Sequence, residues 1–316
     1  MSRIAVTGAT GFVGSNVAEV LASRGHEVIG LVRTLPRLPT PWRPQLTDFG
    51  SADSIAAAMG SVDAVVHCAI TNDFHMLMND RPRAYQSFVD LTNLVTRAAR
   101  GAHLVYISTD WTMDGTRHLT PETDFGNPIN IYGFLKAMGE QVVRDLAPDS
   151  GAVCRIGGVM GAHRLQAVGP RSQDVGFGYF VISLVQALQA GERFAVWGGP
   201  FVNAIATPSL ASEIGAEVER VILRGATGNL HLVGDDAVGR MELAQLVCDV
   251  FDLDPTLLDE IDAPEEQRFP QAVPVDTSLS NTLTKQALAL GETPLRELLV
   301  ALRRESETGV LQPLTN

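Results

Sequence analysis

Cysteine is scarce in this sequence, and the few cysteines form no pattern typical of a metal site or a disulfide framework. The 316 residues contain Cys68, Cys154 and Cys248, with no CxxC pair among them. The seven histidines show no HxH or HExxH spacing. Because metal sites and redox-active pairs need such spacings, we expect no metal and three reduced, buried thiols in a cytoplasmic protein.

Basic residues are also in the minority. The chain has 24 Lys and Arg against 36 Asp and Glu, a formal net charge of −12. Neutralising nucleic-acid phosphates requires a basic face, so we expect no nucleic-acid partner. No apolar run approaches the roughly 20 residues that span a bilayer, and the N-terminus begins with an expected strand instead of a signal peptide, so we expect no membrane association.

Strand and helix patterns alternate along the first half of the chain, which is typical of parallel strands joined by crossover helices. Strands are expected at residues 3–7, 27–32, 64–68, 104–108, 152–156 and, in the second half, 228–233. Helices are expected at 14–24, 54–59, 82–100, 131–146, 179–190, 209–223, 240–251 and 294–304. Loops are expected at 34–44, 112–130, 157–176 and 262–278, and the long segments 34–44 and 157–176 are predicted to face a ligand.

These patterns predict an α/β fold with a doubly wound parallel sheet of the Rossmann type. Residues 1–157 would form the dinucleotide-binding domain, to which residues 201–224 would return. Residues 158–200 and 225–316 would form a smaller, mostly C-terminal α+β lobe for the substrate.

A glycine-rich turn follows the first expected strand and opens the first helix. Gly8, Gly11 and Gly14 have the spacing GxxGxxG. The first permits a tight turn, the second lets the backbone approach a pyrophosphate, and the third lets the helix pack closely, while the helix N-terminus offers N–H groups to the phosphates. The same turn carries further residues expected at the dinucleotide: Thr10, Phe12 and Val13.

The end of the second strand indicates which dinucleotide is bound. An acidic residue there would pair with the ribose 2′-hydroxyl of NAD. This sequence has Val32 and Arg33, followed by Arg37, with no carboxylate available. Because an arginine can bind a 2′-phosphate bidentately, we expect NADP (as NADPH) in preference to NAD, the alternative being that Arg33 is a solvated surface residue.

Tyr132 and Lys136 are the candidate proton-transfer pair. Their spacing places both side chains on one face of a helix. A lysine cation beside a tyrosine lowers the tyrosine pKa toward the range useful at neutral pH. Upstream, an apolar strand ends in Ser108 and Thr109, and hydroxyls at the carboxyl end of a parallel strand face the ligand crevice. Thr109, or alternatively Ser108, is therefore expected to bond the reacting oxygen.

Together these motifs resemble the extended short-chain dehydrogenase/reductase superfamily, and within it the dTDP-4-dehydrorhamnose reductase family. The resemblance covers nearly the whole chain. The superfamily motifs are Gly8/Gly11/Gly14, His67-Cys68-Ala69, Ser108-Thr109-Asp110 and Tyr132-x-x-x-Lys136. The family resemblance is carried by residues 106–115, 121–124, 207–214, 231–234, 241–244 and 278–279.

The resemblance implies a role for each catalytic residue. Tyr132 would donate or accept the proton, Lys136 would hold the nicotinamide ribose and tune Tyr132, and Thr109 would position the substrate carbonyl. Other residues expected at the cofactor are Asp48, Phe49, Cys68, Ala69, Ile107, Ser108 and Ile156. A homodimer through the helices at 82–100 and 131–146 is implied by the superfamily alone.

The substrate side departs from the family. Gly158 stands where the family has a tryptophan, Asn203-Ala204 replaces its Asp-Gln, and Trp111 replaces a tyrosine. Arg155 and Arg171 are candidates for holding a substrate diphosphate, each with an ordinary surface or ion-pair role as the alternative. Trp197 is either a stacking surface or an aromatic packing residue. The residues expected at the substrate are Asp110, Trp111, Gly158, Arg171, Trp197 and Asn203.

The expected function is NADPH-dependent reduction of a keto group, on the 4-keto carbon of a nucleotide-linked deoxysugar. An epimerase that uses NAD(P) transiently would carry the same Tyr and Lys. A dehydratase of this superfamily would have Glu where Trp111 stands, which argues against dehydration. A redox-silent binding or regulatory subunit of the same fold is the remaining alternative, against which the intact Thr109, Tyr132 and Lys136 argue.

Overall fold

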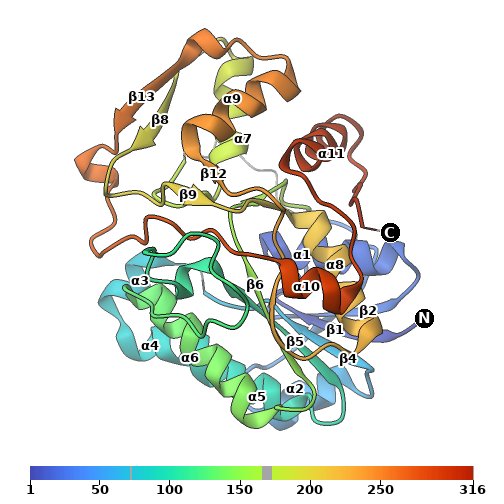
Figure 1. The fold of residues 1–316 in the computed structure, drawn as a ribbon. Coiled ribbons are helices and arrows are strands. Elements are labelled where there is room, and N and C mark those ends of the chain that lie inside the picture. Colours follow the sequence, from blue (N-terminus) through green and yellow to red (C-terminus); the bar gives the residue numbers. More distant parts are fainter. Residues whose placement is uncertain (72, 166–172, 316) are drawn as a thin grey trace.

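The computed structural model describes residues 1–71, 73–165 and 173–315. Its centre is a seven-stranded sheet in the order β11-β6-β5-β4-β1-β2-β3, in which every neighbouring pair is parallel (Figure 1). The order reverses between β1 and β4, the switch point at which doubly wound sheets bind ligands. The strands of the sheet are β1 (Arg3–Thr7), β2 (Glu27–Val32), β3 (Arg43–Leu46), β4 (Ala64–His67), β5 (His103–Thr109), β6 (Gly151–Ile156) and β11 (Gly228–His231).

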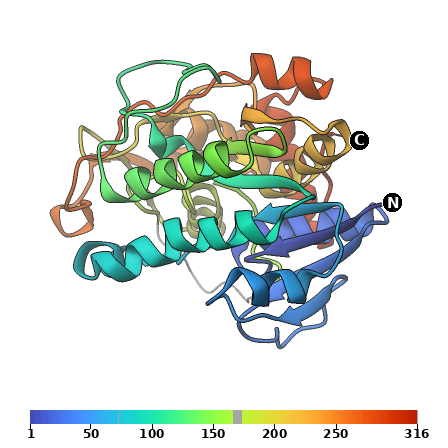
Figure 2. The ribbon, with the colours of Figure 1, turned by 90° about the horizontal axis from the view of Figure 1, so that it is seen from below.

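Helices cover both faces of this sheet (Figures 1 and 2). On one face, α1 (Phe12–Ser23) and α8 (Ala211–Arg224) bury residues such as Val17 and Val218 against the strands. On the other, α2 (Ala52–Met59), α5 (Leu91–Ala98) and α6 (Ile131–Leu146) bury residues such as Val95 and Val143. The chain therefore has the Rossmann-type α/β fold that the sequence predicts.

The helix expected at 82–100 contains a π-helical segment. It consists of α4 (Arg81–Tyr85), the π-helix η1 (Gln86–Asp90) and α5, and it follows the short α3 (Phe74–Asn79). Such segments interrupt the regular hydrogen-bond ladder and are frequent at functional sites.

A smaller lobe packs on one edge of the Rossmann domain around its own apolar core. The core takes side chains from the three longest helices of the lobe, for example Phe180, Leu184, Val247 and Leu298. The main elements of the lobe are α7 (Phe180–Gln189), β8 (Phe194–Gly198), α9 (Arg240–Phe251), β13 (Leu258–Asp262) and α11 (Leu295–Thr308). The connecting elements are η2 (Asp110–Thr112), β7 (Val159–Met160), β9 (Ile205–Ala206), β10 (Ser209–Leu210), β12 (Val238–Gly239), η3 (Pro255–Leu257), η4 (Glu265–Gln267) and α10 (Thr282–Leu288).

Several elements differ from the sequence prediction. The strand β11, expected in the smaller lobe, pairs with β6 and is the seventh strand of the Rossmann sheet. The strand β3 was not predicted: it begins in the last two residues of the loop expected at 34–44, and Pro44 is tolerated there because β3 is an edge strand. Parallel strands β8 and β13 were not predicted at all. No described helix is both long and apolar enough to cross a membrane.

Candidate functional site

A cavity of about 830 Å³ opens at the carboxyl ends of the central strands and extends between the two lobes. Its volume lies within the range of small-molecule sites. Most of the residues predicted for the site line it: Gly8, Thr10, Gly11, Phe12, Val13, Gly14, Arg33, Phe49, Cys68, Ala69, Ile107, Ser108, Thr109, Asp110, Trp111, Tyr132, Lys136, Ile156, Gly158 and Asn203. Asp48 and Trp197 are not among the lining residues, and Arg171 lies outside the described residues.

The glycine turn forms a cradle that a side chain would fill. Gly8 has φ +68°, and a Cβ there would lie 2.8 Å from the Cα of Ala69. A Cβ on Gly14 would lie 2.2 Å from the carbonyl oxygen of Gly8. Gly11 caps α1 without any side-chain hydrogen bond, so the first N–H groups of the helix are left for a ligand. These features fit the diphosphate of a dinucleotide.

Arg33 and Phe49 line the part of the cavity that is expected to hold the cofactor. Arg33 follows β2 directly, is exposed, and forms none of the ion pairs among the described residues. Asp48, expected near the adenine, accepts a hydrogen bond from the Gly50 N–H at 2.9 Å. Its carboxylate is thus used to close its own turn.

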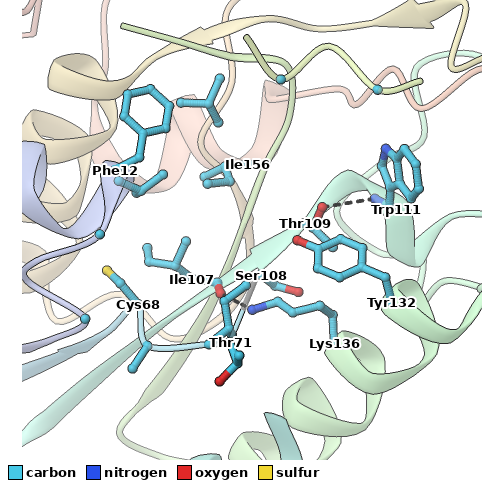
Figure 3. A pocket seen from close by; sticks show the side chains of 18 of the residues that line it. Phe12, Cys68, Thr71, Ile107, Ser108, Thr109, Trp111, Tyr132, Lys136 and Ile156 are labelled. Carbon is cyan, nitrogen blue, oxygen red and sulfur yellow. Dashed lines mark hydrogen bonds between the residues drawn. The ribbon is translucent and has the colours of Figure 1, made fainter. Parts of the chain in front are cut away.

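The proton-transfer residues meet at the middle of the cavity (Figure 3). Thr109 ends β5, and its hydroxyl is hydrogen-bonded to that of Tyr132 in the first turn of α6. The helix begins there because the side chain of Asn130 accepts a hydrogen bond from the Gly133 N–H at 2.9 Å. The Thr109 oxygen also accepts from the Trp111 N–H at 3.3 Å. The site therefore brings together the two hydroxyls that the sequence singled out.

Lys136 does not act on Tyr132 in the way the spacing suggested. Its Nζ donates to the carbonyl oxygen of Ile107 at 2.6 Å and lies 4.3 Å from the centroid of the Tyr106 ring. Burial raises the pKa of Tyr132 to about 12, against a smaller lowering by the Thr109 hydrogen bond. Burial also lowers the pKa of Lys136 to about 8, although Glu140 opposes it. In this structure the pKa of Tyr132 is therefore set mainly by desolvation and not by the charge of Lys136.

A buried ionic network lies beneath the site. The carboxylate of Glu140 accepts the Ser108 hydroxyl at 2.6 Å and two Arg155 nitrogens at 2.9 and 2.8 Å. Arg155 also donates to the Asp124 carbonyl at 2.7 Å and is fully buried. Of the two roles considered for Arg155, the ion-pair role is therefore the one that the structure supports, because the whole guanidinium is committed inside the protein. The Ser108 hydroxyl is likewise bound to the buried Glu140, whereas the Thr109 hydroxyl lies beside that of Tyr132, which favours Thr109 as the hydroxyl for the reacting oxygen.

Aromatic side chains form the wall next to Tyr132. Trp111 packs edge-on against Tyr132 and against Phe269, with ring centroids 6.0 and 6.2 Å apart. Trp197 belongs to β8, is buried behind Trp111 and shares a cluster with Val202. It is thus a packing residue, the second of the two roles considered for it.

Two of the replaced family positions, Gly158 and Asn203, are constrained by contacts within the protein. Gly158 has φ +49°, and a Cβ there would lie 3.0 Å from the Cα of Pro208 and 3.5 Å from Phe177. A side chain here would therefore press on the backbone of Pro208 and strain a left-handed backbone conformation that favours glycine. The side-chain amide of Asn203 donates to the carbonyls of Ile205 and Val275, at 3.1 and 3.2 Å. Asn203 thus fastens the segment that follows β13 instead of pointing its amide at a ligand.

Asp110 also lines the cavity but is held from both sides. Its two carboxylate oxygens accept hydrogen bonds from Thr109 at 3.1 Å and from Thr277 at 2.5 Å. Burial raises its pKa to about 6 in spite of these bonds. Because both oxygens are bonded within the protein, Asp110 is better suited to orient the Thr109 hydroxyl than to bind a sugar.

The structure adds lining residues that the sequence did not single out. Gln86 and Ser87 come from the π-helix, whose register change a sequence pattern does not reveal. Asp174 and Tyr179 come from the start of the smaller lobe, and Arg268 and Phe269 from the segment expected to be a loop at 262–278. The sequence analysis assigned no ligand-facing role to that loop. The lining residues missed include Thr71, Arg83, Gln86, Ser87, Asp174, Tyr179, Arg268 and Phe269.

The Rossmann fold, the glycine cradle and the Thr-Tyr-Lys set define the class of this chain: it is an enzyme of the NAD(P)-dependent, extended short-chain dehydrogenase/reductase type. The model of the RmlD substrate-binding domain matches residues 2–307. The chain therefore belongs to that family.

Individual relatives agree with this assignment. Over 311 residues, the chain is 27% identical to a probable low-salt glycan biosynthesis reductase of Haloferax volcanii, covering 94% of this chain and 96% of the relative. Over 306 residues it is 26% identical to a dTDP-4-dehydrorhamnose reductase of Mycolicibacterium smegmatis, covering 95% and 84%. The solved dTDP-4-dehydrorhamnose reductase of Bacillus anthracis in complex with NADP shares the fold, with a TM-score of 0.78, 20% identity and 96% and 99% coverage.

Proposed function

We propose that this protein is an NADPH-dependent reductase that converts a keto group of a nucleotide-linked sugar into a hydroxyl. The observation that carries the proposal is the hydrogen bond between Thr109 and Tyr132, with Lys136 one turn along the same helix and all three lining one cavity. A ketone oxygen placed between the two hydroxyls would accept hydrogen bonds from both as negative charge develops on it.

The proton comes from Tyr132. With its pKa raised to about 12 by burial, the phenol keeps its proton at neutral pH, which suits a donor in the reducing direction. The Thr109 hydroxyl, oriented by Asp110, fixes the carbonyl, and Trp111 with Phe269 shields it from water. Lys136, anchored on the Ile107 carbonyl, is placed to hold the nicotinamide ribose. Bound NADPH supplies the hydride.

Arg33 supports the choice of NADPH over NADH. It lines the cavity directly after β2, and the described lining residues of β2 and of the segment that follows it, Leu31, Val32, Arg33 and Phe49, include no carboxylate to bond a ribose hydroxyl. We expect Arg33→Ala to weaken NADPH binding by about 1–3 kcal/mol, the scale of a charge-assisted contact, and to leave NADH nearly unchanged. Arg37→Ala, at an exposed position outside the cavity, is the matched control. Equal affinities of the unmodified protein for NADPH and NADH would refute the cofactor assignment.

The substrate is proposed to differ from dTDP-4-dehydrorhamnose. The support is the contrast between a retained proton-transfer set and an altered wall, in which Gly158 stands where the family has a tryptophan and Trp111 packs against Phe269. A site built around particular hydroxyls discriminates strongly, so a different wall redirects the choice. The test compares kcat/KM for dTDP-4-dehydrorhamnose with kcat/KM for other nucleotide-linked and free ketones. A value above about 10⁴ M⁻¹s⁻¹ for dTDP-4-dehydrorhamnose would assign that activity instead.

Net consumption of NADPH separates the proposed reductase from its rivals. A reductase consumes one NADPH for each ketone reduced. An epimerase interconverts sugars without net loss of the cofactor, and a redox-silent subunit binds NADPH without turning over any ketone. A homodimer through the helices at 82–100 (α4, η1 and α5) and 131–146 (α6) is also proposed, in keeping with the half-exposed Phe134 on α6, and light scattering after gel filtration would test it.

A further inference from the structure

Asp174 is a carboxylate that lines the cavity and that the proposed reaction does not use. It lies a few residues before α7, is half-buried, and lines the same cavity as Tyr132 and Trp111. A Cβ on Gly176 would lie 3.3 Å from the Oδ1 atom of Asp174 and 3.2 Å from the Trp111 ring. The carboxylate therefore lies close to the tryptophan that packs against the proton donor, Tyr132 (Figure 3).

One oxygen of this carboxylate is held by the protein and the other is open. Oδ1 of Asp174 accepts a hydrogen bond from the Gly176 N–H at 2.9 Å, which fixes the orientation of the group. Among the described residues, no other residue donates a hydrogen bond to Oδ2. A Cβ on Gly178 would lie 3.1 Å from Oδ2, so the glycine at this position leaves that oxygen uncovered. Oδ2 is thus available to accept hydrogen bonds from a ligand.

The buried side chain of Arg240 lies behind the segment that carries Asp174. Its guanidinium donates to the carbonyl oxygens of Asn203, Asp174 and Gly176. Burial raises the pKa of the Asp174 carboxyl to about 6, although the charge of Arg240 opposes this rise. Asp174 is therefore mostly ionised at neutral pH, and its charge is already partly balanced from inside the protein. Such a group is better suited to a neutral hydrogen-bond donor than to a second cation.

We propose that Asp174 binds a hydroxyl group of the sugar ring that carries the ketone, and thereby selects among nucleotide-linked sugars; this inference rests on the function proposed above. Because the ketone must lie against Tyr132, the ring that carries it lies along the wall formed by Trp111 and Asp174. A hydroxyl that donates to a carboxylate makes a charge-assisted hydrogen bond, and a sugar without that hydroxyl leaves the carboxylate without a partner. Asp174 is thus a specificity-determining residue, while Tyr132 remains the proton donor.

Calorimetric titration of the NADPH-saturated protein with sugars that carry no ketone tests this without any turnover. dTDP-glucose is compared with dTDP, and UDP-glucose with UDP. The nucleotide on which glucose adds more affinity is then titrated as its 2-deoxy, 3-deoxy and 6-deoxy sugars. We expect one of these deoxy sugars to bind the unmodified protein about tenfold more weakly than the glucose form, the scale of a hydrogen bond to a charged group.

Asp174→Asn keeps an oxygen for the Gly176 N–H but removes the charge. It should weaken binding of the glucose form about tenfold and leave binding of the bare nucleotide unchanged. With the deoxy sugar that lacks the contacted hydroxyl, the same variant should lose little, because that contact is already missing. A residue that merely supports the fold would not show this dependence on one hydroxyl.

Asp254→Asn is the matched control. Asp254 also accepts a hydrogen bond from the N–H two residues on, that of Thr256, at 2.9 Å, but it is exposed and does not line the cavity. This variant should leave every affinity unchanged.

The proposal is overturned if glucose adds no affinity on either nucleotide, or if Asp174→Asn binds the glucose form as the unmodified protein does. It is also overturned if Asp174→Asn weakens all three deoxy sugars, or the bare nucleotide, as much as the glucose form. Dependence on one hydroxyl without reduction of any ketone would uphold the Asp174 contact and reject the reductase function. Reduction of a ketone without that dependence would reject the contact alone.

Discussion

At the scale of single side chains, the ion pair of Glu140 and Arg155 ties the end of β5, which carries Thr109, to the interior of the protein. Burial raises the pKa of Glu140, but Arg155, Ser108 and Arg144 together outweigh burial and hold that pKa below its usual value. The carboxylate is therefore charged inside the protein and depends on Arg155, its fully buried partner. Because Ser108 precedes Thr109, this network also fixes the strand end that carries the reacting hydroxyl.

Arg155→Met should destabilise the protein by about 3–5 kcal/mol, since it leaves the Glu140 charge buried without its main partner. Arg144→Met is the control: Arg144 also bonds Glu140, at 2.6 Å, but is partly exposed, and its loss should cost about 1 kcal/mol or less. Urea unfolding measures both. An Arg155→Met protein that unfolds at the wild-type urea concentration, yet binds nucleoside diphosphates weakly, would restore the ligand role for Arg155.

The sequence predicted the catalytic residues better than their surroundings. The four-residue spacing was enough to place Tyr132 and Lys136 on one helix face, since helix geometry dictates it. The sequence could not decide whether Ser108 or Thr109 bonds the reacting oxygen. Successive strand residues point to opposite faces of the sheet, but the sequence alone does not show which face Glu140 occupies. Desolvation of Tyr132 likewise depends on Trp111 and Phe88 packing around it, which only the folded chain shows.

At the scale of secondary structure, the segment 263–278 docks on the N-terminus of α6. The Gln271 side chain accepts a hydrogen bond from the Ile131 N–H at 2.8 Å, and the Asn130 side chain donates to the Ala272 carbonyl at 3.1 Å. Gln271 therefore satisfies a free N–H of the helix one residue before Tyr132. The smaller lobe thus positions the proton donor through the same segment that carries Arg268.

Gln271→Leu should lower kcat by about five- to tenfold, because a lost cap of about 1 kcal/mol loosens the turn that carries Tyr132. The KM for NADPH should change little. Gln271→Glu keeps an acceptor oxygen and should retain most of the activity. Steady-state kinetics on all three proteins separates the two parameters. A Gln271→Leu enzyme with unchanged kcat would show that this contact does not position Tyr132.

The elements that the sequence missed are those without a clear pattern. The strand β3 reads Arg-Pro-Gln-Leu, and β13 carries three acidic residues, so neither shows the apolar run of a buried strand. The long helices were predicted to within a few residues because their apolar faces repeat with helical spacing. The role of 263–278 was beyond prediction, since it depends on docking across the lobes and not on local sequence.

At the scale of the whole molecule, buried neutral histidines link stability to pH. His67 is fully buried between the Thr7 and Thr92 hydroxyls, and burial, helped by the Lys136 charge, lowers its pKa to about 3. The unfolded chain protonates this residue near its ordinary value of 6.5, whereas the folded chain does not. As pH falls from 6.5 toward 3, the unfolded state binds more protons, so the contribution of His67 to stability is lost in that window.

Unmodified protein should therefore lose stability more steeply than His67→Asn on acidification, by up to about 1.4 kcal/mol per pH unit below 6.5. Acidic groups with raised pKa values, such as Asp110 and Asp174, stabilise the folded state as the pH falls. This opposite effect is the same in both proteins and does not change the difference between them. Urea unfolding at several pH values measures the two slopes. His75→Asn, at an exposed position, should follow the unmodified curve. Parallel curves for the His67 variant and the unmodified protein would contradict this account.

Transfer of deuterium from NADPH labelled at both C4 positions tests the central claim, that Tyr132 and NADPH reduce a nucleotide-linked ketone. The ketosugars are incubated with one equivalent of the labelled cofactor, and the product is analysed by mass spectrometry. The account predicts one deuterium on the new carbinol carbon, one oxidised cofactor per product, and a rate about 10²–10⁴-fold lower in Tyr132→Phe. Sugar recovered as an epimer with the cofactor unconsumed, or turnover by Tyr132→Phe at the unmodified rate, would contradict it.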